Sequence, residues 1–169
     1  MTKPATTPAA WRLVACTPTP CYEWTAYGAL PAELGANAPR PGAVCIAADG
    51  GTVSLHPAPA RWLLPDVAPA VVAALDAAQR AQAGVLTDVT GKWRRLRFVA
   101  TDRAAPAQAH PLSSGLPIEL LLNDRDCAAT WVFDCPVIVA RCAEELETWI
   151  EASYEASFVE LLATLGVEA

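Results

Sequence analysis

Histidine and cysteine are the residue types in this chain best suited to nucleophilic, acid–base or metal chemistry. The two histidines, His56 and His110, are each followed by proline in a loop-like stretch, and neither has metal-motif spacing. The six cysteines form no C-x-x-C pair and stand at positions 16, 21, 45, 127, 135 and 142. We interpret the histidines as structural or solvent-exposed residues and the cysteines as small buried hydrophobes, not as catalytic or metal-binding groups.

The acidic residues and glycines provide no stronger candidate. Asp124, Asp126 and Asp134 lie in expected loops, where aspartates usually cap helices or lie in solvent rather than act as acids and bases. The segment Asp49-Gly50-Gly51 is typical of a hairpin turn, and the sequence contains no glycine-rich phosphate loop and no nucleophile elbow. We therefore predict no catalytic, cofactor-binding or metal-binding residues in this chain.

A basic segment beside a tryptophan is the anomalous feature of this acidic chain. Lys92, Arg94, Arg95 and Arg97 supply four of the twelve basic residues within six positions, next to Trp93. Such a strand can bind a small anion or a protein partner, and its charges can protect a sheet edge. Alternatively, the basic side chains pair with acidic residues across a sheet.

The acidic residues that could pair with this segment are Glu147 and Glu151. Together with Trp149 they lie on one face of an expected strand over 146–152. We predict a surface that pairs internally or contacts a partner or an anion, made by Trp93, Arg95, Arg97, Glu147, Trp149 and Glu151. We interpret Trp62, Trp131 and Trp149 as core or interface anchors, because all three lie in expected strands.

Length and composition limit the classes of protein that fit. A chain of 169 residues predicts one domain. Only 18% of the residues are charged, against about 25% in average domains, which favours a surface partly covered by a partner unless alanine richness explains it. The net charge of −6 argues against nucleic acid. Because we find no signal peptide and no membrane-spanning stretch, we expect a cytoplasmic protein with reduced thiols.

Short strands and two amphipathic helices are the elements expected to position these residues. Strands are predicted over 11–16, 22–27, 61–64, 136–141 and 146–152, with hairpins over 44–55 and, about Thr90-Gly91, over 85–100. One helix is expected to start at an Asp66 cap and end at Gly84, and the last to start at a Ser153 cap and end at Gly166. Two short helices are expected within 103–125.

The order of these elements predicts the domain organisation and the fold class. We expect a disordered tail over 1–10, an irregular strand-and-loop appendage over 11–43, and one domain over 44–169. Hairpins alternating with helices predict an α+β fold, in which helices pack on one face of antiparallel sheet in ferredoxin-like βαββαβ elements.

Four segments resemble those of a known family. They are Arg61-Trp-Leu-Leu-Pro65, Val85–Gly91 with Leu96-Arg-Phe98, Ala128–Thr130 with Pro136–Val139, and Glu147–Ile150 with Ala152–Phe158. Over residues 44–165 the chain resembles the gamma subunit of heterotetrameric sarcosine oxidase, a member of the aminomethyltransferase-like (glycine-cleavage T-protein) group. It departs from the family at Ala152, where an arginine is usual, and lacks the K-G-C-[FYW] motif of related folate-binding iron–sulfur maintenance proteins.

The resemblance implies a role without chemistry of its own. It implies a non-catalytic small subunit of a sarcosine oxidase-like, flavin-dependent amine oxidase complex, in which large alpha and beta flavoprotein subunits hold FAD, FMN, NAD and tetrahydrofolate. The alternative is a stand-alone domain of the same fold that binds folate or another small anion beside Arg95 and Arg97.

Overall fold

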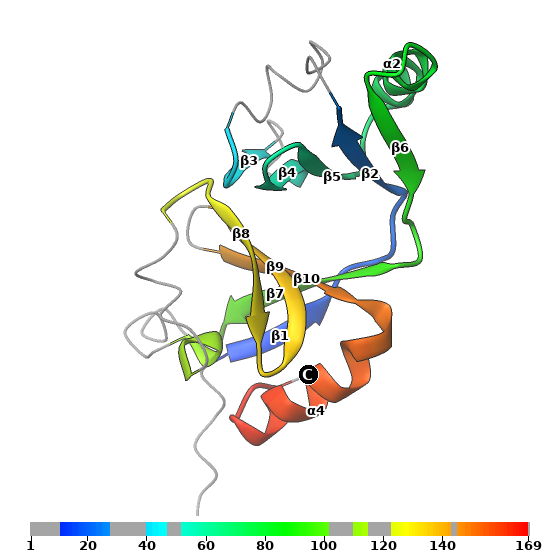
Figure 1. Ribbon diagram of the computed structural model, residues 1–169. Coiled ribbons are helices and arrows are strands. Elements are labelled where there is room, and N and C mark those ends of the chain that lie inside the picture. The colour runs from blue at the N-terminus through cyan, green and yellow to red at the C-terminus, as the bar shows by residue number, and fades with distance from the viewer. Residues whose placement is uncertain are drawn as a thin grey trace, which may run out of the picture.

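Two antiparallel sheets of five strands each organise the chain (Figure 1). The computed structural model describes residues 11–27, 40–46, 52–101, 110–114, 123–142 and 145–168. In chain order the elements are β1 (Trp11–Ala15), β2 (Cys21–Ala26), β3 (Ala43–Ile46), β4 (Thr52–Ala58), β5 (Arg61–Pro65), α2 (Pro69–Arg80), β6 (Gly84–Asp88), β7 (Trp93–Ala100), η2 (Pro111–Ser114), β8 (Cys127–Val132), β9 (Cys135–Cys142), β10 (Glu145–Glu151), η3 (Ala152–Tyr154) and α4 (Glu155–Thr164).

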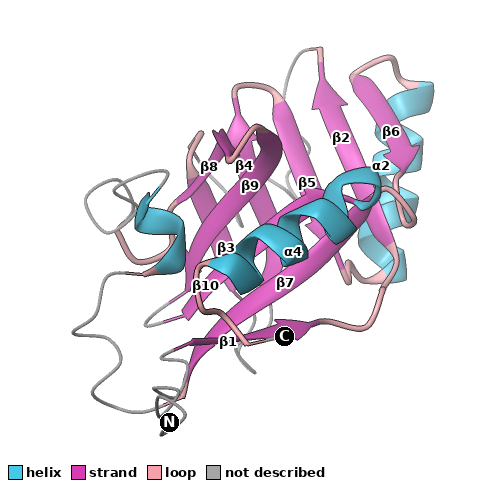
Figure 2. Cartoon of the chain, turned by 90° about the horizontal axis from the view of Figure 1, so that it is seen from below, coloured by secondary structure: helices cyan, strands magenta, loops and turns pink. Residues whose placement is uncertain are grey.

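The two sheets lie between two helices in four layers. The first sheet has the order β1-β7-β10-β9-β8 and the second sheet the order β3-β4-β5-β2-β6. Helix α4 covers the outer face of the first sheet, and α2 packs on the second sheet (Figures 1 and 2). The predicted α+β class is confirmed, with each helix on a different sheet.

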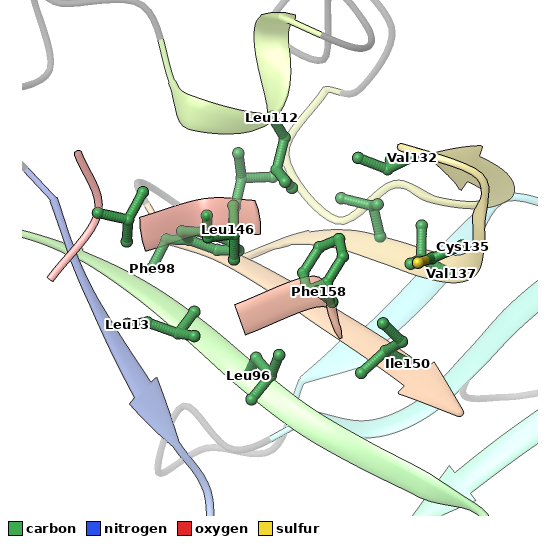
Figure 3. Packing of buried hydrophobic residues seen from close by; sticks show 13 residues of the cluster. Leu13, Leu96, Phe98, Leu112, Val132, Cys135, Val137, Leu146, Ile150 and Phe158 are labelled. Atoms are coloured by element: carbon green, nitrogen blue, oxygen red, sulfur yellow. The ribbon is translucent and has the colours of Figure 1, made fainter. Parts of the chain in front are cut away.

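The core of the first sheet lies under α4 (Figure 3). Phe158 and Leu162 of α4 are buried against Leu96 and Phe98 of β7 and Ile150 of β10. These strand residues share one face because side chains alternate along a strand. Burial of each large apolar side chain contributes about 1.5–3 kcal/mol, so this contact holds α4 in place.

The other two core clusters hold the remaining layers together. Ile138 and Trp149 of the first sheet pack against Leu55 and Leu63 of the second sheet. On the far side of the second sheet, the buried side chains of Trp24, Trp62, Leu64 and Leu75 form the contact with α2. Each sheet is thus covered by a neighbour on both faces over part of its area.

The expected hairpin over 85–100 is wrong, because its two strands belong to different sheets. β6 pairs with β2 of the second sheet, whereas β7 pairs with β1 and β10 of the first. The turn between them is bonded to the start of β2: the Cys21 amide donates to Thr90 Oγ1 at 3.0 Å and the Val89 amide to the Cys21 carbonyl at 2.9 Å. These long-range bonds carry the chain from one sheet to the other.

The predicted ends of α2 are also wrong. Asp66 has a φ of +53° and donates its amide to the Pro20 carbonyl, which holds it outside the helical region. The helix therefore begins at Pro69, with Ala68 as an N-cap that makes no side-chain hydrogen bond. Gly84 does not end the helix but lies in β6, packed against β2.

The last helix ends as expected but begins differently. Ser153 lies in the short 3₁₀ helix η3, and the N-cap of α4 is Tyr154, without a side-chain hydrogen bond. Gly166 adopts a φ of +82° and donates to the Ala163 carbonyl, while the following amide donates to Leu162. This is the left-handed helix end that favours glycine.

Residues 11–27 are an integral part of the domain rather than an appendage. β1 pairs with β7 along its whole length, and β2 lies between β5 and β6. The remaining predicted strands, including the β9–β10 hairpin and the β3–β4 pairing, are confirmed. The expected tail, the 49–51 turn and most of 103–125 lie outside the described residues. None of the described helices is long and apolar enough to cross a membrane.

Candidate functional site

The six residues predicted to share a surface lie side by side on two paired strands. β7 carries Trp93, Arg95 and Arg97, and β10 carries the other three. The antiparallel register places Glu147 opposite Arg97, Trp149 opposite Arg95, and Glu151 opposite Trp93. The predicted complementary alternation of these two strands is confirmed.

A buried carboxylate is the centre of this surface. The Glu147 side chain is 3% exposed; Arg95 Nη2 donates a hydrogen bond to its Oε1, and Arg97 Nε lies 3.8 Å from the same oxygen. Arg97 also donates to Glu145, and this hydrogen bond raises the pKa of its guanidinium. A carboxylate this deeply buried requires such partners, because an unpaired charge removed from water costs several kcal/mol.

The other two basic residues of the segment pair with acidic residues nearer the solvent. Lys92 Nζ lies 3.5 Å from Glu151, and Arg94 Nε lies 3.2 Å from Glu155 at the start of α4. Partly exposed pairs of this kind each contribute less than about 1 kcal/mol. All four cations therefore have carboxylate partners within the chain, and the interpretation as internal pairing is confirmed.

Two other interpretations of the basic segment lose support. β7 lies between β1 and β10, so its charges do not protect a sheet edge. An anion beside Arg95 and Arg97 would compete with Glu147 and Glu145 for the same guanidinium groups. A neighbouring groove over the β6–β7 turn is lined by two carboxylates, Glu23 and Asp88, against one cation, Lys92, a balance that also disfavours an anionic ligand.

The tryptophans of the predicted surface differ in their surroundings. Trp149 is buried between the sheets, and Arg95 Cζ lies 5.4 Å from its ring centroid, within the range of a cation–π contact. Trp62 is buried beneath α2. Trp131 is instead 65% exposed on β8, so it is not a core anchor.

The two histidines lie on opposite sides of the double sheet. His56 is buried and stacks on Trp62 with ring centroids 3.9 Å apart, in the layer next to α2. His110 is buried near the outer face of the first sheet, where it contacts Trp11 and Phe98 edge-on and accepts a hydrogen bond from the Leu112 amide. Because both sheets separate them, the two imidazoles cannot act on one ligand.

Five of the cysteines are free thiols, those at positions 16, 21, 45, 127 and 135. Burial, assisted by the nearby charge of Asp66, raises the pKa of Cys21 to about 12. Burial also raises the pKa of Cys16 and of Cys135. The thiolate is the reactive form, so these three groups are held in their unreactive form.

We expect Cys21 to react much more slowly with iodoacetamide at pH 8 than an unfolded control, with full reactivity restored in urea. Because its pKa is raised on folding, its contribution to stability is intact below pH 9 and is lost as pH rises towards about 12. Peptide-level mass spectrometry of the labelled protein measures the rate at each pH. Rapid labelling of native Cys21 at pH 8 would contradict the assignment.

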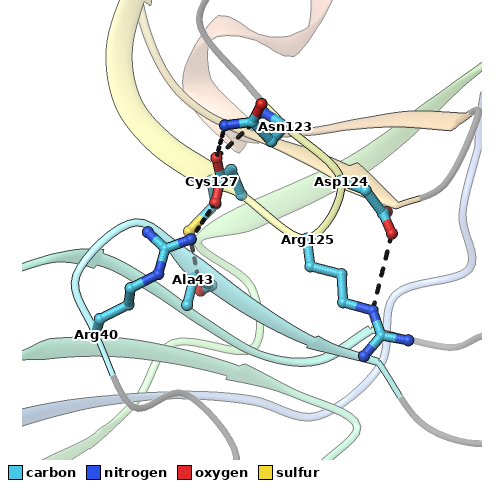
Figure 4. A network of polar contacts seen from close by, with 7 residues as sticks. Arg40, Ala43, Asn123, Asp124, Arg125 and Cys127 are labelled. Atoms are coloured by element: carbon cyan, nitrogen blue, oxygen red, sulfur yellow. Dashed lines mark hydrogen bonds and ion pairs between the residues drawn. The ribbon is translucent and has the colours of Figure 1, made fainter.

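A polar network that the sequence did not indicate ties the two sheets together (Figure 4). Arg40 Nη2 donates to Asp126 Oδ1 at 2.6 Å, and the Asn123 amide and side chain donate to Oδ2 at 3.1 and 3.0 Å. Next to it, backbone bonds join Gly42 to Cys127 and Val44 to Arg125, so β3 meets the start of β8. Asp126 is 9% exposed, which corrects its interpretation as a solvated loop residue.

Replacement of Asp126 by alanine is expected to cost about 1 kcal/mol of unfolding free energy, because it removes the hydrogen bonds that join Arg40 and Asn123 to this buried carboxylate, while both donors can turn to water. Burial alone would raise the pKa of this carboxyl, but hydrogen bonds from Arg40 and Asn123 lower it. Its contribution is therefore present above pH 3.8 and lost as pH falls through the lowered pKa. Urea titration from pH 2 to pH 7 tests this, with Asp124→Ala as the solvent-exposed control; equal losses would contradict it.

No protein-family model and no curated protein matches the sequence. Among solved structures, a chain of the heterotetrameric sarcosine oxidase from Corynebacterium sp. U-96, in complex with pyrrole 2-carboxylate, matches with a TM-score of 0.73 at 20% identity. The match covers 95% of this chain and 85% of that chain. The chain has the fold of a sarcosine oxidase chain.

This sarcosine oxidase fold accounts for more of the molecule than the sequence resemblance did. The resemblance began at residue 44, whereas coverage of 95% extends into the region that contains β1 and β2. High coverage on both sides also means that the two chains are similar in length, so the match is not to one domain of a much larger chain. The predicted likeness to this oxidase is confirmed at the level of the fold.

Proposed function

We propose that this chain is the small, gamma-type subunit of a heterotetrameric sarcosine oxidase-like, flavin-dependent amine oxidase complex. In this role it contributes to assembly and holds no catalytic centre. The observation that carries the proposal is the fold match, which extends over nearly all of this chain and most of the sarcosine oxidase chain. A likeness of this extent is expected of corresponding subunits.

The use of the reactive side chains supports a structural role. Within the described ranges, no group of three or more potential ligands is placed to hold a metal ion. The buried Glu147 and Asp126 are each held by arginine, and three thiols have raised pKa values. These groups bind the fold together, which fits a subunit whose contribution is its surface.

The proposed partners are large alpha and beta flavoprotein subunits, acting together in the cytoplasm. Under this proposal FAD, FMN, NAD and tetrahydrofolate bind to those subunits, and this chain binds none of them. The stand-alone folate- or anion-binding alternative has less support, because Arg95 and Arg97 already pair with Glu147 and Glu145.

Reconstitution with and without this chain tests the assembly role. The large flavin-bearing chains of the source organism are co-expressed with and without it, and the products are compared by gel filtration, flavin absorbance and sarcosine turnover. We expect a defined flavin-bearing complex only in its presence. Equal yield, mass and turnover in its absence would overturn the proposal.

A further inference from the structure

Among the described residues, none bonds to the outer edge of β8 after Cys127, whereas each of the other three sheet edges receives at least one hydrogen bond from a neighbouring segment. At β1, the Leu13 amide donates to the Glu168 carbonyl at 2.7 Å, so the end of the chain covers that edge. At β6, the Leu86 amide donates to Gln79 Oε1 at 2.6 Å, so a side chain of α2 covers that edge. At β3, backbone bonds reach the residues that precede and begin β8.

The pairing of β8 with β9 shows which of its backbone groups face outward. Trp131 lies opposite Pro136, which has no amide hydrogen, so these two residues form a non-hydrogen-bonded pair. By alternation, the amide and carbonyl groups of Ala129 and Trp131 point away from β9. Cys127 has the same outward orientation, and its amide bonds to Gly42. Among the described residues, none bonds to the outward groups of Ala129 or Trp131.

The side chains of β8 have none of the features that prevent an edge strand from pairing with another strand. Native edge strands are commonly blunted by charge, proline or a bulge, because an open edge is a template for pairing. The sequence of β8, Cys-Ala-Ala-Thr-Trp-Val, has no charge and no proline, and its register with β9 is regular. Trp131 is 65% exposed, and exposed tryptophan is enriched at the energetic centres of interfaces.

We propose that the edge of β8 from Ala128 to Val132 receives a short extended segment of a partner subunit, which adds a strand to the first sheet. An apolar side chain of that segment lies against Trp131, and main-chain bonds form at Ala129 and Trp131. This inference deepens the proposed function and rests on it, because it assigns the surface through which the subunit joins its complex.

The dimensions and charges of this edge select the occupant. The Gly42–Cys127 bond closes one end, and the two-residue turn at 133–134 closes the other, so only a short strand fits. The absence of charge on β8 favours an uncharged segment. A second copy of this chain fits poorly: the antiparallel register that uses Ala129 and Trp131 of both copies brings the exposed Asp134 of each copy towards the acidic start of β8 in the other, where Asp124 and Asp126 lie. Like charges there disfavour self-pairing.

Two matched pairs of variants test the proposal in the full chain, by affinity capture of the flavin-bearing partner chains. Ala129→Pro removes only an outward amide, since proline is tolerated there in an edge strand, and Ala129→Val keeps that amide. Trp131→Ala removes the indole, and Tyr27→Ala removes a similarly exposed aromatic ring that directly follows β2. Thermal unfolding of each variant verifies that the fold is retained.

We expect Ala129→Pro and Trp131→Ala each to weaken capture roughly tenfold or more, while both control variants stay within about twofold of the wild type. Capture unchanged by both test variants would overturn the β8 site and leave the proposed function standing. Failure of the wild-type chain to capture any flavin-bearing chain would overturn both. A wild-type homodimer that Trp131→Ala dissociates, seen by analytical ultracentrifugation, would make β8 a self-interface and overturn the partner assignment.

Discussion

Replacement of Gly84 by alanine is expected to lower the free energy of unfolding by about 3 kcal/mol or more. A Cβ atom at this position would lie 2.5 Å from Trp24 Cζ2 and closer still to the Thr25 carbonyl oxygen. Neither neighbour can move easily, because Trp24 is fully buried and β2 is bonded on both sides, to β5 and to β6. The variant must therefore displace β6 or repack the layer beneath α2.

Urea unfolding followed by tryptophan fluorescence measures this loss, since the unfolding midpoint falls in proportion to the lost free energy. Gly91→Ala is the matched control: its Cβ would meet nothing within 4 Å, and we expect a change of less than about 0.5 kcal/mol. Similar midpoints for the two variants would show that β6 does not approach β2 as closely as described.

Replacement of Glu147 by glutamine is expected to cost about 3 kcal/mol, the second large effect. The variant removes the negative charge that lies between Arg95 and Arg97. The two positively charged guanidinium groups then lie close together without that charge between them, and Arg95 is only 20% exposed to water. Removal of one partner from a buried ion pair costs more than the pair contributes, because the remaining charge stays desolvated.

Glu145→Gln provides the comparison on the same strand. Its side chain is 46% exposed and pairs with Arg97 at the surface, so we expect a loss below about 1 kcal/mol. Raised salt should reduce the effect of Glu145→Gln more than that of Glu147→Gln, because surface pairs are screened more strongly. Equal costs in low salt would contradict the buried position of Glu147.

Local patterns predicted the parts of the fold that depend on local physics. The alternation of residues 146–151 placed Glu147 and Trp149 on the same face, and the complementary charges on residues 92–97 indicated their pairing. Gly166 ended the last helix as expected, because its left-handed backbone conformation depends only on the residues next to it in the chain. These features depend on side-chain period and backbone sterics, which are readable in a single sequence.

Long-range bonds determined what the sequence could not show. Thr90-Gly91 has the chemistry of a hairpin turn, but its bonds to Cys21, 69 residues away from Thr90, direct β6 and β7 into different sheets. Arg40 and Asp126 are separated by 86 residues, so nothing in either segment indicated their contact. The edge position of β8 and the exposure of Trp131 likewise depend on the strand order and on how the sheets pack, which one segment of sequence does not show.

The structure changes which surface is the best candidate for binding a partner. The charged face of β7 and β10, the predicted candidate, is largely satisfied within the chain. The open edge of β8, with its exposed indole, is better suited to bind a partner. Replacements in the charged face should therefore lower stability, whereas replacements at Ala129 and Trp131 should lower association with little loss of stability.

The native mass of the protein purified from the cells that produce it tests the central claim most directly. Native mass spectrometry, with a visible absorption spectrum of the same fraction, reports both the partners and their cofactors. The proposed role predicts one assembly that contains this chain together with larger chains and that shows flavin absorption. A fraction containing this chain alone, without larger subunits and without flavin, would contradict it.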